Sequence, residues 1–221
     1  MCRRPLTSLL LCCIFAVLGL SPCRAQPGKP LGDETLEAVS LMMDSARAES
    51  LPAETLMQKA LEGSTKGATD QKIREAVRAL LNRLRLAKKA LGSDATPPEL
   101  TTAAGAIYAG VDTSGIRRLK EAQAVRKTGD PSNDQTLAAE FVVLADLISR
   151  NVPVDTASQV VIGLAEANVG FAEIFEFRRL VEQDIRAGVV PAESAYKRAR
   201  RLAPSLPPFG REPARQPEDS R

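Results

Sequence analysis

Residues 70–91 read DQKIREAVRALLNRLRLAKKAL, and this stretch decides the fold class. Its apolar residues recur at intervals of four, three, four, three and four, at Ile73, Val77, Leu80, Leu84, Ala87 and Leu91. That spacing places them along one side of an α-helix, whose turn takes about 3.6 residues. The stretch therefore predicts a long amphipathic helix that packs its apolar side against neighbouring helices.

The same helical spacing returns along most of the remaining chain. It recurs between residues 137 and 148 and between residues 154 and 164. No segment alternates apolar and polar residues for long enough to suggest a sheet. The chain is therefore expected to be all-α, with about nine helices at residues 33–49, 53–65, 70–91, 97–109, 114–127, 134–150, 154–167, 171–186 and 191–202.

Three of the expected helices begin with a similar short motif. The motif is an apolar residue, proline, a second apolar residue, an acid and a hydroxyl, at LPAET (51–55), VPVDT (152–156) and VPAES (190–194). Proline suits the first position of a helix, where its missing N–H would be unpaired anyway. The acid then lies in the first turn, near the positive end of the helix dipole.

A second motif marks the turns before three long helices. Glycine or asparagine stands six residues ahead of an isoleucine, at Gly67, Gly110 and Asn168 before Ile73, Ile116 and Ile174. Glycine and asparagine readily adopt the left-handed conformation that ends a helix. Degenerate helical hairpins of this kind stack into a short superhelix. An irregular bundle is an equal alternative, because the spacing between repeats is uneven.

The first 25 residues, MCRRPLTSLLLCCIFAVLGLSPCRA, predict a signal peptide. Two arginines precede an apolar run that is too short to span a bilayer, and small residues precede a cleavage site after Ala25. The mature protein is therefore expected to be exported, either periplasmic or extracellular. If Cys23 were lipidated instead, the protein would be a membrane-tethered lipoprotein.

Composition divides the mature chain into three parts. Residues 26–32 are expected to form a short Pro/Gly linker, and residues 33–202 the helical hairpin domain. Residues 203–221, APSLPPFGREPARQPEDSR, are rich in proline and charge and are expected to be a disordered tail.

The composition also excludes several classes of function. All four cysteines lie in the signal peptide and the chain has no histidine, which excludes Ser-His-Asp catalysis and zinc–thiolate sites. Three of the 30 basic residues and none of the 27 acidic ones lie in the signal peptide, so the mature chain is electrically balanced. A balanced chain exerts no long-range attraction on nucleic acid. No cofactor, metal or nucleic-acid partner is expected.

Residues 51–67, LPAETLMQKALEGSTKG, resemble a pattern found in uncharacterised exported α-helical proteins of bacteria. The resemblance covers the LPAE, KALEG and KG elements, which is roughly a tenth of the mature chain. It implies a helical fold and an exported protein. It implies no activity, because the segment carries no catalytic residues.

Glu49-Ser50 and Leu56-Met57-Gln58 resemble two signatures of the lytic transglycosylases, which are exported helical enzymes. The resemblance implies that Glu49 would be a carboxyl of raised pKa, acting first as an acid and then as a base. The chain departs from that family because no glycine precedes Leu56, the two elements are too close together and the aromatic sugar platform is missing. The structural alternative is that Glu49-Ser50 ends the first helix.

Two groups of residues are candidates for binding. Residues 171–185 are unusually apolar, which predicts either core packing or a partly exposed groove for a partner helix or peptide. The basic run at residues 197–201 predicts either a solvated helix end or an anionic-ligand patch. The candidate binding residues are Phe171, Phe175, Phe177, Lys197, Arg198, Arg200 and Arg201.

These observations favour an exported, non-catalytic helical protein that binds or scaffolds a protein or peptide partner in the cell envelope. The alternative is a glutamate-dependent enzyme that cleaves peptidoglycan. A buried acid facing a cleft would favour the enzyme, whereas acids placed only at helix starts would favour the scaffold. Membrane attachment is expected only if Cys23 carries a lipid.

Overall fold

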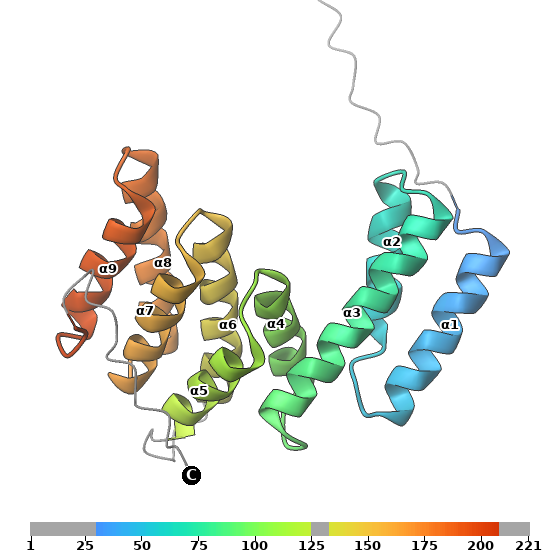
Figure 1. Cartoon of the computed structure of the whole chain (residues 1–221), viewed down its shortest axis with the longest axis horizontal. Coiled ribbons are helices and arrows are strands. Elements are labelled where there is room, and N and C mark those ends of the chain that lie inside the picture. The colour runs from blue at the N-terminus through green and yellow to red at the C-terminus, as the bar shows by residue number, and fades with distance from the viewer. Residues whose placement is uncertain (1–29, 125–132, 208–221) are drawn as a thin grey trace, which may run out of the picture.

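The computed structural model describes residues 30–124 and 133–207, and this part of the chain folds into nine α-helices without a strand (Figure 1). The expected signal peptide, including Cys23, lies outside the described residues. Within the described part, no helix is both long enough and apolar enough to cross a membrane. The all-α prediction is confirmed.

The helix bounds agree closely with those expected from the sequence. They match within one residue at every end that both cover, although residues 125–127 of the fifth expected helix lie outside the described part. In chain order the helices are α1 (Asp33–Ala48), α2 (Glu54–Thr65), α3 (Asp70–Leu91), α4 (Pro97–Tyr108), α5 (Thr113–Ala124), α6 (Asn133–Ser149), α7 (Val154–Glu166), α8 (Phe171–Arg186) and α9 (Pro191–Leu202).

The helices stack one after another in two rows. In one row, α1, α3, α5, α7 and α9 each pack against the next member, and in the other row α4 packs against α6 and α6 against α8. Hairpin neighbours such as α6 with α7 and α8 with α9 join the rows. In Figure 1 the array runs from α1 at one end to α9 at the other. This serial stacking is the arrangement of stacked helical hairpins.

Six helices end in the same left-handed turn. Backbone φ is positive at Ser50, Gly67, Gly110, Asn151, Asn168 and Gly188. In each turn the N–H of the following residue donates to a carbonyl five residues earlier, as Val111 does to Ala106 at 3.1 Å. This is the Schellman motif, which satisfies carbonyls that the helix leaves unpaired. The turns predicted at Gly67, Gly110 and Asn168 are confirmed.

The core contains the three predicted isoleucines, since Ile73, Ile116 and Ile174 are buried. The long helix also buries one position that the predicted spacing did not include. Leu81 rather than Leu80 is buried in α3, whereas Leu80 only packs at the edge of the core. The two leucines are adjacent, and the broad apolar side of this helix accommodates both.

The proline rule holds for only part of the repeat. Pro191 occupies the first turn of α9, as predicted. Pro153 is instead the residue that precedes α7, and Pro52 lies before the N-cap Ala53 of α2. The prediction of a first-position proline is therefore wrong at Pro52 and Pro153. There the fixed φ of proline orients the chain just before the helix rather than within it.

The ordered domain continues beyond α9. Ala203 and Leu206 are buried, and Leu206 packs over Gly163 of α7. The hydroxyl of Tyr196 donates to the carbonyl of Pro207. Residues 203–207 therefore belong to the helical domain, although the composition assigned them to the disordered tail. The rest of that expected tail, residues 208–221, lies outside the described residues.

Candidate functional site

The candidate site is best understood by aligning α8 with α6. Both helices end in the same left-handed turn, at Asn151 and at Gly188, so positions 37 residues apart correspond. On this register Val143 of α6 corresponds to Leu180 of α8. Each side of α6 therefore has a matching side on α8.

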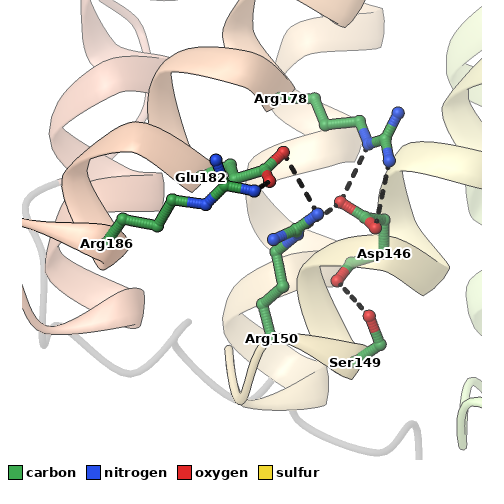
Figure 2. A network of polar contacts seen from close by, with 6 residues as sticks. All are labelled: Asp146, Ser149, Arg150, Arg178, Glu182 and Arg186. Carbon is green, nitrogen blue, oxygen red and sulfur yellow. Dashed lines mark hydrogen bonds and ion pairs between the residues drawn. The ribbon is translucent and has the colours of Figure 1, made fainter. Parts of the chain in front are cut away.

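A network of ion pairs identifies the side of α6 that meets α8 (Figure 2). Asp146 Oδ2 of α6 accepts from Arg150 Nε at 2.8 Å and from Arg178 Nε of α8 at 2.8 Å. Arg150 also pairs with Glu182 of α8 at 3.2 Å, and Glu182 pairs in turn with Arg186. Asp146 and Arg150 therefore lie on the face of α6 that packs against α8, the next helix of its row. We call this side of each helix the forward face.

The pKa of Asp146 reflects this network. Partial burial raises the pKa, but hydrogen bonds from Arg178 and Arg150, with their positive charges, more than offset this effect and leave the pKa below its usual value. The same contacts raise the pKa of both arginines. All three groups are therefore charged at neutral pH, and they hold α8 against the forward face of α6.

The forward face of α8 carries a groove in place of a further helix. In the described part of the chain, α8 packs substantially against α6 and α9 only. The groove has a volume of about 350 Å³ and lies between α8 and α9. Its lining residues are Ala172, Glu173, Glu176, Phe177, Leu180, Arg198, Arg201 and Leu202.

An ion pair holds the two walls of this groove together. Asp184 of α8 accepts two hydrogen bonds from Arg198 of α9, at 2.8 Å and 2.6 Å, and one from the Ser194 hydroxyl at 2.9 Å. The hydrogen bonds from Arg198 are the main reason that the pKa of Asp184 falls to about 2. Arg198 is therefore engaged within the hairpin, which positions the neighbouring cations of α9.

A second depression of about 430 Å³ lies along α9 and shares Arg201 with the first. Lys197, Arg200 and Arg201 line it together with Glu193. These three cations are exposed, and none of them forms an ion pair with another residue of the described chain. The α9 side of the combined groove is therefore basic.

The α8 side of the groove is acidic. Glu176 is paired with Arg179 at 2.6 Å, and this contact lowers its pKa. Glu173 accepts a hydrogen bond from the Gly170 N–H at 2.9 Å and so caps the start of α8. An apolar floor with one acidic and one basic edge suits an amphipathic polypeptide better than a small uniformly charged ligand.

The structure separates the three predicted aromatic residues. Phe177 is 1% exposed and forms part of the groove floor, whereas Phe171 is 39% exposed and Phe175 is half-buried. The rings of Phe171 and Phe175 pack edge to face, with centroids 5.0 Å apart. At about 100° of helix rotation per residue, these two rings lie on a different side of α8 from Glu176 and Leu180. The predicted apolar arc is therefore not one surface.

The predicted basic residues do lie beside a surface hollow. Arg198 and Arg201 line the groove, and Lys197, Arg200 and Arg201 line the neighbouring depression. Sequence reasoning missed the contribution of Leu202 and of the acidic edge, Glu173 and Glu176. The signal for this edge was present in the spacing of Glu173, Glu176 and Leu180, which places them on one side of a helix.

The glutamate proposed for lytic chemistry has the opposite environment to the one required. Glu49 is the residue that ends α1, as the structural alternative predicted, and its carboxylate is bound by Arg85 at 2.6 Å. Hydrogen bonds from Arg85 are the main cause of the lowered pKa of Glu49. A general acid needs a raised pKa.

Glu140 of α6 is a fully buried acid that the sequence did not single out. It does not line either of the grooves described above, whose walls are formed by other residues.

The described residues also contain no group of three His, Cys, Asp or Glu side chains placed to hold a metal ion. The candidate site therefore consists of the α8–α9 groove and the cations beside it. No known protein family, no curated protein and no solved structure matches this chain.

Proposed function

We propose that this chain is an exported, non-catalytic binding or scaffolding protein of the cell envelope that contacts a protein or peptide partner through its terminal hairpin. The observation that carries the proposal is the groove between α8 and α9, which has an apolar floor and charged edges. Leu202, one of the apolar residues that line this groove, remains 37% exposed. Grooves of this kind commonly receive the apolar side of a partner segment.

The chemistry of the chain supports a binding role over an enzymatic one. Histidine is missing from the sequence, and the cysteines lie in the expected signal peptide. The carboxylate of Glu49 is committed to Arg85, and its pKa is lowered rather than raised. No observation favours the peptidoglycan-cleaving alternative. Export and any lipid at Cys23 remain proposals based on residues 1–25.

Site-specific photocrosslinking tests the proposal. A photoreactive phenylalanine analogue would replace Leu202 at the groove in the chain from Gln26 to Arg221. The matched control would carry the analogue at Leu61 of α2, which is 52% exposed at the other end of the array. Each protein would be irradiated in a solubilised envelope extract, and the adducts would be identified by mass spectrometry.

We expect a defined protein adduct from position 202 that position 61 does not form. The adduct should disappear when Leu180 is also changed to Glu, provided that circular dichroism shows an intact helical fold. The same adducts from both positions, or only peptidoglycan fragments from position 202, would refute the docking proposal.

A further inference from the structure

We infer that the occupant of the α8–α9 groove is an amphipathic α-helix whose apolar stripe contacts Leu180 and Leu202 and whose acidic flank faces Lys197, Arg200 and Arg201. This inference rests on the proposed function and deepens it by naming the chemistry of the partner. Three independent features of the terminal hairpin support it.

The first feature is the repeat register. The forward face of α6 is covered by a helix, since Asp146 and Arg150 on that face bind Arg178 and Glu182 of α8. The α8 residue Leu180 corresponds to Val143, which is fully buried in α6. A helix laid on the forward face of α8 would therefore occupy the place that α8 occupies on α6. The array already contains this packing geometry between α6 and α8.

The second feature is the shape of the apolar floor. Phe177 and Leu180 come from α8 and Leu202 comes from α9, so the floor is a slot between two helices. Phe177 is almost inaccessible and Leu202 is the most exposed apolar residue of α9. A recessed slot accepts side chains that project from a partner helix. Insertion into a bilayer would instead need apolar residues that project from this protein.

The third feature is the distribution of charge along the slot. Lys197, Arg200 and Arg201 have no acidic partner within the described chain. Arg201 lines the slot on its α9 edge, and Lys197 and Arg200 line the depression that adjoins it. On the α8 edge, Glu176 is paired with Arg179, whereas Glu173 has no cationic partner within the described residues and disfavours a partner that is acidic on all sides. The complementary helix therefore carries carboxylates on the flank that meets α9 and neutral or basic residues on the flank that meets α8.

A displayed library of amphipathic helical peptides tests the inference. Leucines would be kept along one stripe, and the flanking positions would vary among Glu, Gln and Lys. The library would be selected on the immobilised chain from Gln26 to Arg221 at low salt. Affinities of the selected peptides would then be measured by fluorescence anisotropy against the R200E/R201E double variant and the L202E variant.

The matched controls change exposed residues of the same types elsewhere. R117E/R118E on α5 makes the same charge change at two adjacent exposed arginines, and L61E places a glutamate at an exposed leucine on α2. Circular dichroism would confirm that every variant keeps its helical content. Vesicles that contain anionic phospholipid would serve as the competing polyanionic surface.

We expect the selected peptides to carry Glu on one flank. Their affinity should fall about tenfold in R200E/R201E but not in R117E/R118E, and replacing the flank Glu by Lys should restore binding to the double variant. Selected peptides without a Glu preference that are lost in L202E would overturn the inference but leave the proposed function intact. Binding of the vesicles in place of any peptide, or no selection at all, would also overturn it.

Discussion

The hairpins α6–α7 and α8–α9 share one design but differ on one side. In each hairpin a left-handed turn joins the two helices, at Asn151 and at Gly188. With Pro153 and Pro191 aligned, both second helices bury the same inner positions, such as Val161 of α7 and Ala199 of α9, which are 38 residues apart. Val160 is fully buried in α7, whereas the corresponding residue of α9 is Arg198. Ile162 is 7% exposed, whereas its counterpart Arg200 is an exposed charged residue.

The difference follows from the neighbours of each helix. Helix α7 lies between α5 and α9 in its row, whereas α9 packs against α7 on one side and has no further described helix on the other. An apolar residue is favourable only where a neighbour removes it from water. Terminal units of stacked repeats accordingly carry a polar outer face. The groove is the apolar part of this outer face.

The largest expected effect comes from giving Val160 of α7 the arginine that α9 carries at the corresponding position. Val160→Arg should lower the free energy of unfolding by about 3–5 kcal/mol, because a charge would be buried without a partner. Urea denaturation followed by circular dichroism measures the change. The control is Gln159→Arg, the adjacent partly exposed position, which should cost less than about 1 kcal/mol. A small loss for V160R would show that this side of α7 is not covered.

The next effect concerns the chain after α9, which packs back onto α7. Leu206→Ala should cost about 2–3 kcal/mol, since Leu206 is 6% exposed and covers Gly163. Leu202→Ala is the matched control, because Leu202 is 37% exposed, and it should cost less than about 1 kcal/mol. Thermal denaturation of both variants checks the difference. Equal losses would mean that residues 203–207 add nothing to the domain.

A double-mutant cycle sharpens this prediction. A Cβ at Gly163 would lie 2.2 Å from Leu206 Cδ2, so Gly163→Ala forces the leucine to move and should cost about 1–3 kcal/mol. In a Leu206→Ala background the same change should cost much less, because the obstructing side chain is gone. Additive losses in urea denaturation would contradict the contact.

A smaller, pH-dependent effect is expected from the ion pair that closes the terminal hairpin. The folded pKa of Asp184 is about 2, below its ordinary value, so its carboxylate stabilises the fold above about pH 4. That contribution, at most about 2 kcal/mol, is lost as the pH falls towards 2. Asp184→Asn should therefore lower stability by about 1–2 kcal/mol at neutral pH and flatten the profile between about pH 4 and 2.

Urea denaturation across this pH range checks the effect of Asp184. The control is Asp44→Asn in α1, whose exposed carboxylate pairs within the described part of the chain with Arg47, three residues later. That change should stay within about 0.5 kcal/mol. Parallel profiles for D184N and the unchanged protein would contradict the role assigned to Asp184.

The smallest expected effect is the reverse exchange, Arg200→Ile, which gives α9 the residue of α7. Arg200 forms no ion pair in the described chain and is exposed, so the free energy of unfolding should change by less than about 0.5 kcal/mol. Thermal denaturation measures this. A loss above about 1 kcal/mol would mean that the outer side of α9 is covered after all.

The helices themselves were predictable because the signals that start and end them are local. Gly110 and Asn168 adopt the left-handed conformation, and the turns form there. Glycine reaches this conformation freely because it lacks a Cβ, and asparagine tolerates it. The turns at Ser50 and Asn151 were missed, because serine rarely adopts this conformation and the motif at 151 lacked the following isoleucine. Leu80 was preferred over Leu81 because periodicity alone does not separate adjacent apolar residues.

The candidate site was predictable only in part. The basic run of α9 was identified by its charge, and the structure places three of its members along one depression. The aromatic residues of α8 were grouped by composition, but Phe177 and Phe171 lie on different sides of the helix and only Phe171 is well exposed. Sequence spacing specifies which residues share a side of a helix, but not which side a neighbour covers.

The sequence by itself therefore determined an all-α chain, its nine described helices and most of their turns, since periodicity, caps and left-handed residues act over one or two turns of backbone. Only the tertiary structure decided that Asp146 meets Arg178 and that no further described helix covers the forward face of α8. These outcomes depend on contacts between residues far apart in the chain. Whether an apolar side becomes core or a groove is determined by the helix that packs on it.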